Sequence, residues 1–319
     1  MRMPSYLSPT SLKIWKEKRD DFYLFYLADK KATRPPQTQP MSVGSAFDAY
    51  VKSFLVEKLL GKRPEFEFTT IFEAQVEAHN RDWALEAGKI CFDAYTKQGA
   101  LSDILYDMVG CIGEPRFETK LEGFVTSVSV SKEGIPLLGK PDIYFIHKKG
   151  ARVIFDWKVN GYCGVNPTSP KPGYVRERTN DLRTTGKQHA KAMVMEHQGV
   201  KISAQHPLCT VEKDWAAQLS IYAWLLGEDI GSDFVTAIDQ LACGPDSFGG
   251  KSIRVAQHRS IVTPAFQRQV FTDAAMAWTQ IKSGHIYEWM TRADSDAQCA
   301  MLESMAAAPA DELFDEMMR

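Results

Sequence analysis

Two short segments of the sequence carry side chains suited to hydrolytic chemistry. The first holds Asp142 in a Gly-Lys-Pro-Asp run, and the second holds Asp156 and Lys158 in Phe-Asp-Trp-Lys. Side chains alternate between the two faces of a strand, so Asp156 and Lys158 share one face while Trp157 points to the other. Two strands joined by a short turn place Asp142 beside Asp156, and paired carboxylate oxygens are the ligands that Mg²⁺ and Mn²⁺ prefer. An ordinary ion pair between Asp156 and Lys158 on an exposed strand is the alternative interpretation.

Further polar residues lie at helical spacing on either side of these strands. Upstream, Gly44 and Asp48 belong to an otherwise apolar predicted helix. Downstream, Gln218 and Tyr222 are separated by four positions and therefore share one face of a helix predicted to begin near Lys213. Packing of that helix is the alternative role for both residues, and for Tyr222 above all.

The order of these fragments resembles that of the RecB-like branch of the PD-(D/E)XK nuclease superfamily, in particular its phage-encoded exonucleases. The family order is an N-terminal helix with a polar start, a G-x-x-x-H helix, a G-x-x-D strand, a D/E-x-K strand and a Q-x-x-x-Y helix. The resemblance covers residues 7–226. The matching segments here are Leu12 onward, Gly44–Asp48, Gly139–Asp142, Asp156–Lys158 and Gln218–Tyr222.

The chain departs from the family pattern at two places. The family histidine is replaced by Asp48, which keeps a metal ligand at that position and favours a hard ion such as Mg²⁺ or Mn²⁺. Many relatives also hold an iron–sulfur cluster through cysteines that flank the nuclease core. No cysteine occurs in the expected N-terminal region, where Glu17–Arg19 stand, so we expect no iron–sulfur cluster.

The resemblance implies a role for each matching residue. Asp142 and Asp156 would bind Mg²⁺ or Mn²⁺, with the backbone carbonyl of Trp157 and the side chain of Asp48 as further ligands. Lys158 would position the attacking water. The helix residues Gln218 and Tyr222 would orient the phosphodiester or support the lysine.

A basic segment lies between the Asp-Trp-Lys strand and the Gln218 helix. Phosphate groups of a DNA backbone attract such clustered positive charge, and an aromatic ring among them can stack on an unpaired base. A solvated surface loop is the alternative interpretation. The candidate DNA-binding residues are Lys171, Tyr174, Arg176, Arg178, Arg183, Lys187 and Lys191.

Composition excludes several other classes of protein. The 319 residues carry a net charge of −2, so no global basic field indicates a nucleic-acid partner. The six cysteines are widely spaced and suit reduced intracellular thiols. No apolar run reaches the roughly 20 residues that span a bilayer, and no signal peptide precedes the first helix, which predicts a cytoplasmic protein without a membrane partner (the host cytoplasm if phage-encoded). Residues 244–252 resemble a phosphate loop, but proline at position 245 breaks the required spacing, so no use of ATP is expected.

The periodicities predict a single α+β domain over residues 1–319, with a restriction-endonuclease-like core in which helices flank a central mixed sheet. Residues 1–110 are predicted to be helical. The catalytic core is assigned to residues 116–159 and 213–262, with a basic loop insertion at 160–212 and C-terminal helices at 263–319. Within the core, strands are predicted over 117–131, 135–146 and 152–159, with a turn at 133–134, and a further helical stretch is predicted over 72–97.

Three functions are consistent with this interpretation. The leading one is a metal-dependent DNA exonuclease that acts in recombination, repair or DNA processing, with DNA as its partner and a single-strand annealing or recombination protein as a further one. A structure-specific endonuclease on the same fold is the second. A non-catalytic DNA-binding or assembly protein is the third, and the presence of Asp142, Asp156 and Lys158 together favours catalysis over it.

Overall fold

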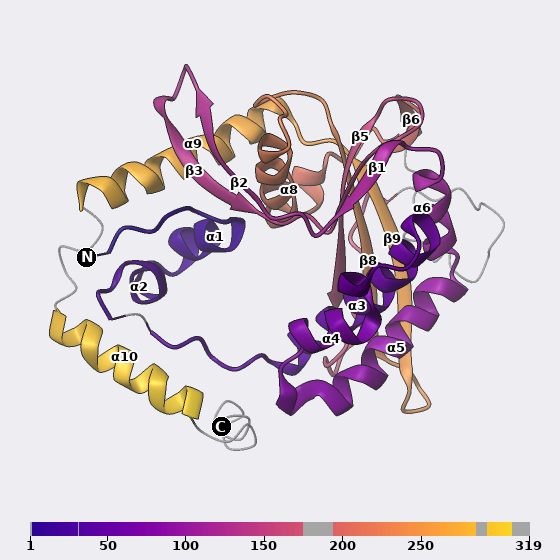
Figure 1. Cartoon of the computed structure of the whole chain (residues 1–319), viewed down its shortest axis with the longest axis horizontal. Helices are drawn as coiled ribbons and strands as arrows, with labels where there is room; N and C mark the ends of the chain where they lie inside the picture. Colours follow the sequence, from indigo (N-terminus) through magenta and orange to yellow (C-terminus); the bar gives the residue numbers. More distant parts are fainter. Residues whose placement is uncertain (1, 31, 175–193, 285–291, 308–319) are drawn as a thin grey trace.

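A mixed five-stranded sheet forms the centre of the computed structural model, which describes residues 2–30, 32–174, 194–284 and 292–307 (Figure 1). The strand order is β1-β4-β5-β8-β9. Neighbouring strands run antiparallel except for β5 and β8, which are parallel. The strands are β1 (Ile112–Phe117), β4 (Ile143–Ile146), β5 (Arg152–Asn160), β8 (Val235–Pro245) and β9 (Lys251–Ser260).

Helices cover both faces of this sheet (Figure 1). One face packs against α3 (Gln39–Leu60), α5 (Arg81–Lys97) and α6 (Ala100–Met108), and the other against α8 (Lys213–Leu225). Strand β5 shows why both faces are filled: Phe155 and Trp157 join the core beneath α3, while Ile154 joins the core beneath α8. Because side chains alternate along a strand, a strand buried on both faces must be apolar at nearly every position. An acidic residue within it therefore stands out.

The remaining helices extend the two layers. Near α3 lie η2 (Pro64–Phe66), α4 (Phe68–Gln75) and η3 (Ala78–Asn80), and α7 (Leu208–Val211) precedes α8. The N-terminal and C-terminal helices lie together on the α8 side of the molecule (Figure 1). These terminal helices are α1 (Pro9–Glu17), α2 (Arg19–Phe22), η1 (Tyr23–Leu27), α9 (Pro264–Ser283) and α10 (Arg292–Ala307). No helix in the part of the chain that the structure describes is long and apolar enough to cross a membrane.

Two small hairpins stand outside the central sheet. Strands β2 (Leu121–Ser127) and β3 (Ser131–Gly139) form the first, and β6 (Val194–His197) and β7 (Val200–Ser203) form the second. The second hairpin and α7 lie within the predicted insertion at 160–212.

The α+β class, with a mixed sheet flanked by helices and a helical N-terminal part, is confirmed. The strand boundaries differ in three places. The strand predicted over 117–131 is divided between β1, which ends at Phe117, and β2, which begins at Leu121. The hairpin turn follows Ser127 instead of occupying 133–134, and the strand predicted over 135–146 is two strands in different sheets. Pro141 lacks a backbone donor, so the chain leaves β3 after Gly139 and starts β4 at Ile143. The helical stretch predicted over 72–97 is likewise divided at 76–80.

His258 on β9 is buried between the sheet and α8. Its ring centroid lies 5.8 Å from that of Trp215, and its Nε2 is 3.1 Å from Gln240 Oε1. Burial, with the positive charges of Arg259 and Lys171, lowers the pKa of His258 to about 3. The imidazole is therefore neutral in the folded protein even in mild acid.

This buried histidine predicts a loss of stability in acid. An unfolded histidine titrates near pH 6.5 and the folded one near 3, so between these values the unfolded chain binds the extra proton. Stability is thus lost as the pH falls, by about 2 kcal/mol between pH 7 and pH 5. The His258→Gln variant keeps a donor for Gln240 and lacks the titrating ring, so it should lose about 2 kcal/mol less over that range. Urea unfolding of both proteins at the two pH values measures this, and an equal pH dependence would contradict it.

Candidate active site

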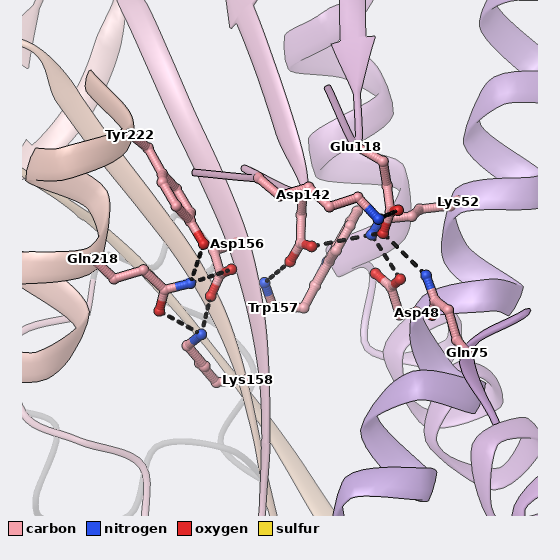
Figure 2. A network of polar contacts seen from close by, with 11 residues as sticks. Asp48, Lys52, Gln75, Glu118, Asp142, Asp156, Trp157, Lys158, Gln218 and Tyr222 are labelled. Carbon is pink, nitrogen blue, oxygen red and sulfur yellow. Dashed lines mark hydrogen bonds and ion pairs between the residues drawn. The ribbon is translucent and has the colours of Figure 1, made fainter. Parts of the chain in front are cut away.

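Five of the residues singled out in the sequence lie together between α8 and the central sheet (Figure 2). Strand β5 supplies Asp156 and Lys158, and the connection between β3 and β4 supplies Asp142. Helix α8 supplies Gln218 and Tyr222 from one face. The alternation expected for β5 holds, because Lys158 contacts Gln218 while the Trp157 ring packs on Phe155 and Phe47 on the opposite side of the sheet.

Lys158 is held by two partners. Its Nζ forms an ion pair with Asp156 Oδ2 and donates to Gln218 Oε1 at 3.0 Å. The amide of Gln218 in turn donates to Tyr222 Oη at 2.9 Å and to Asp156 Oδ1 at 3.4 Å. The Asp156 side chain is 6% exposed and that of Lys158 is 23% exposed, so this ion pair lies in a largely buried site and not on an exposed strand. An ammonium in such a place has a fixed position, which a surface lysine does not.

A second group of charges lies on the α3 side of Asp142 (Figure 2). Asp48, Glu118 and Asp142 each offer a carboxylate oxygen, and these oxygens lie within 4.8 Å of one another. The ammonium of Lys52, one helical turn after Asp48, lies among them. Its Nζ is 2.6 Å from Asp48 Oδ2 and 3.0 Å from Asp142 Oδ1, and it also contacts Glu118 Oε1.

Asp142 joins the two groups. Its Oδ1 accepts from Lys52, and its Oδ2 accepts from the backbone N–H of Trp157 at 3.0 Å. Burial alone would raise the pKa of Asp142, but the nearby ammonium groups of Lys52 and Lys158 more than offset this and lower it. Asp142 is therefore kept ionised, and so is Glu118, whose pKa is lowered by Lys52 and Lys140 despite its burial.

Glu118 reaches the site through an unusual backbone conformation. It follows the last residue of β1 and has φ +49°, in the left-handed region that residues other than glycine seldom adopt. Its N–H donates to the carbonyl of Asp142 at 3.1 Å, and its side chain accepts from Gln75 at 3.0 Å and pairs with Lys140. Strained residues cluster at functional sites, where the surrounding contacts hold them in place.

The donor set fits a divalent cation. Among the described residues, the ammonium groups of Lys52 and Lys158 and the more exposed one of Lys140 face four carboxylates, which leaves one negative charge in excess when all four are ionised. The four carboxylates are those of Asp48, Glu118, Asp142 and Asp156. Asp48 Oδ1 is buried and has no hydrogen-bond partner among the described residues. Burial raises the pKa of both Asp48 and Asp156 to about 7, and the charge of Asp142 adds to the effect. Hard oxygen ligands with unbalanced charge suit Mg²⁺ or Mn²⁺.

Trp157 connects the site to a buried hydrogen-bond network on the other face of the sheet. Its indole N–H donates to Tyr95 Oη at 3.2 Å, and Tyr95 donates to Asp239 Oδ2 at 2.5 Å. Arg259 donates to the other oxygen of Asp239 at 2.7 Å. Each of these side chains has a hydrogen-bond partner in the network. The network therefore fixes the position of Trp157, the residue of β5 between Asp156 and Lys158. The predicted ligand role of the Trp157 carbonyl stays a prediction.

The structure describes only two of the predicted DNA-binding residues, Lys171 and Tyr174. Lys171 pairs with Glu212 at 2.8 Å, so its ammonium is already partnered. The Tyr174 ring packs edge-on to His258, with 6.2 Å between centroids. These two residues lie against the protein surface near β9. The others, Arg176, Arg178, Arg183, Lys187 and Lys191, lie outside the described residues.

Sequence reasoning did not identify Lys52, Glu118 or Gln75 as members of the site. A signal existed for Lys52, because it is the charged residue one turn after Asp48 on an apolar helix. Glu118 carried a weaker signal, as an acidic residue near the start of the strand predicted over 117–131. Lys140, next to Asp142 in the quoted motif, also contributes by pairing with Glu118.

Gly139, the glycine of the G-x-x-D motif, has a steric role. A Cβ at this position would lie 2.6 Å from Tyr222 Cδ1 and 2.9 Å from Leu225 Cδ1, closer than side chains pack. The absence of a side chain therefore lets α8 approach β3 and places Tyr222 next to Gln218. Gly44, in contrast, would meet nothing within 4 Å if it carried a Cβ.

Gly139→Ala is therefore expected to impair the site. The added methyl should displace the Tyr222 ring, destabilise the fold by about 1–3 kcal/mol and lower any catalytic rate by up to about a hundredfold. Gly44→Ala is the matched control, because alanine has space in that helix and should raise stability by about 0.5–1 kcal/mol with no loss of rate. Denaturant unfolding and rate measurements on both variants check this, and an equal response of the two would be inconsistent with the steric role.

Comparisons with known proteins give little further guidance. No protein-family model matches this chain. No curated protein matches it. Among solved structures, it is similar to SSO0001, known from a crystal structure, with 12% sequence identity, a TM-score of 0.26 and coverage of 84% of each chain. A similarity at that score carries no argument, so function is inferred below from the residues of the site.

Proposed function

We propose that this protein is a metal-dependent deoxyribonuclease that hydrolyses phosphodiester bonds, acting as an exonuclease of the RecB-like PD-(D/E)XK type. The observation that supports it is the meeting of Asp142, Asp156 and Lys158, from two separate segments, with Gln218 of α8. A carboxylate pair beside an ammonium, with unbalanced negative charge, is a donor set for a divalent ion and a phosphate.

Asp142 and Asp156 would hold the ion, with the free oxygen of Asp48 close by. When bound, the ion supplies Lewis acidity to a phosphate oxygen and lowers the pKa of a coordinated water. The protein's own contribution is to fix these carboxylates, through the Trp157 N–H on one side and Gln218 on the other. Fixed ligands need no rearrangement as charge develops in the transition state.

Lys158 would orient the attacking water and stabilise charge on the phosphate. Its ammonium is held at two of its three donor positions, by Asp156 and Gln218, and its side chain is partly exposed. A third proton therefore remains for a water or a phosphate oxygen. Gln218 acts through this lysine, because it contacts both Lys158 and Asp156. Tyr222 acts one step further away, because its hydroxyl oxygen accepts from the Gln218 amide and holds that amide in place.

DNA as substrate and attack at strand ends are both parts of the proposal. The basic segment of the sequence between β5 and α8 supports DNA, since clustered lysine and arginine bind phosphate backbones. A single-strand annealing or recombination protein would be a natural partner for an enzyme that creates single-stranded ends. The structure-specific endonuclease differs only in whether the site accepts continuous strands.

Digestion of matched linear and covalently closed circular duplexes tests the proposal. With Mg²⁺ we expect the linear DNA to disappear with release of short products, the circle to persist, and both to persist when the chelator EDTA replaces Mg²⁺. Cleavage of the circle would favour the endonuclease. Binding of both DNAs without cleavage, at several Mg²⁺ or Mn²⁺ concentrations, would favour the non-catalytic DNA-binding protein.

A further inference from the structure

Lys52 is the one fully buried lysine among the residues that the structure describes. Its side chain is 1% exposed, and its ammonium contacts three carboxylates from three segments: Asp48 on α3, Glu118 after β1, and Asp142 before β4 (Figure 2). The face of the Trp157 ring lies beneath it, with Nζ 6.0 Å from the ring centroid. This is the environment that a bound cation would have.

The energetics favour a permanent place for this ammonium. An isolated buried charge is costly, but three charge-assisted contacts and an aromatic face offset that cost. If another cation took its place, Lys52 would remain buried without a partner and next to a like charge, which is strongly unfavourable.

Lys158 differs from Lys52 in its number of carboxylate partners and in its exposure to solvent. It pairs with a single carboxylate, that of Asp156, and its side chain is 23% exposed. Its ammonium can therefore keep Gln218 as its partner while Asp156 binds another cation, at a cost that the nearby water reduces. The two lysines thus mark two adjacent cation positions that share Asp142, one closed and one open.

We propose that Lys52 is a built-in cation that permanently occupies the position formed by Asp48, Glu118 and Asp142, so that the protein binds one divalent ion, between Asp142 and Asp156. This inference rests on the proposed metal site. The carboxylates of Asp48 and Glu118 then balance the charge of Lys52, while Asp142 and Asp156 bind the metal. The protein therefore binds one metal ion although the site has four carboxylates.

Counting bound Mn²⁺ tests the proposal without any DNA. Titration of the full-length protein with Mn²⁺, followed by electron paramagnetic resonance of the free ion, should give one ion per chain. The Lys52→Met variant, prepared in the presence of Mn²⁺, keeps the apolar stem and opens the closed position, so it should bind two. Lys89→Met is the matched control: Lys89 pairs with Asp93 four residues away on an exposed helix surface, and its loss should leave the count at one. Two ions on the unmodified protein, or one on Lys52→Met, would overturn the inference.

A second measurement needs no variant and decides the matter if Lys52→Met does not fold. Crystals of the unmodified protein grown with Mn²⁺ should show one anomalous peak, between Asp142 and Asp156, with the Lys52 ammonium still among its three carboxylates. A peak at the Lys52 position, or no peak at the site, would refute the proposal. Neither measurement depends on cleavage, so a protein with one ion and no nuclease activity would disprove the proposed function and leave this inference standing.

Discussion

Replacing Asp142 with asparagine is expected to lower Mg²⁺-dependent cleavage of linear DNA by about a thousandfold or more, which corresponds to several kcal/mol of lost transition-state stabilisation. Asp142 is the carboxylate shared by both halves of the site, and neighbouring ammonium groups keep its pKa low. The asparagine retains an oxygen that can accept from Lys52 or Trp157, so most of the local contacts survive. It loses the negative charge that a divalent ion requires.

The loss must be separated from unfolding. Circular dichroism and thermal unfolding of Asp142→Asn should show a folded protein, while calorimetry should show weaker Mn²⁺ binding. Asp93→Asn removes a carboxylate from the exposed surface of α5 and should retain the full cleavage rate. Full activity of a purified Asp142→Asn protein would show that Asp142 is not a metal ligand.

Replacing Lys158 with methionine should lower the cleavage rate by about 10²–10⁴-fold while metal binding persists. The methionine fills similar space but has no proton to offer a water or a phosphate oxygen. Asp156 loses its ion-pair partner, so its affinity for Mn²⁺ should be unchanged or higher. A rate loss with intact metal binding distinguishes a lysine that acts on the reaction from one that only balances charge.

Lys149→Met serves as the control for this substitution, because Lys149 forms an exposed ion pair with Glu196 away from the site. Single-turnover cleavage at saturating Mg²⁺ and DNA compares the chemical step in the two variants. A Lys158→Met rate within a few-fold of the unmodified protein would exclude a catalytic role for Lys158 and return it to the ion-pair interpretation.

Local periodicity was enough to predict part of the site. The two-residue repeat of a strand places Asp156 and Lys158 on one face with Trp157 opposite, and the four-residue spacing on α8 aligns Gln218 with Tyr222. The structure has both arrangements. Such features depend only on backbone geometry within one element, so they can be predicted from short stretches of sequence.

The positions of Glu118 and Lys52 in the site depend on tertiary structure. Glu118 reaches Asp142 because β1 pairs with β4 and because the chain takes a left-handed turn at Glu118 itself, and neither feature follows from nearby residues. Lys52 on a mostly apolar helix would ordinarily extend its ammonium to water. Only the packing of α3 against the sheet shows that this ammonium is enclosed by carboxylates brought from positions 118 and 142. Local sequence patterns therefore predict which face of each element carries the chemically active side chains. Long-range packing determines which charges share one buried space, because that depends on distances between elements that no local pattern encodes.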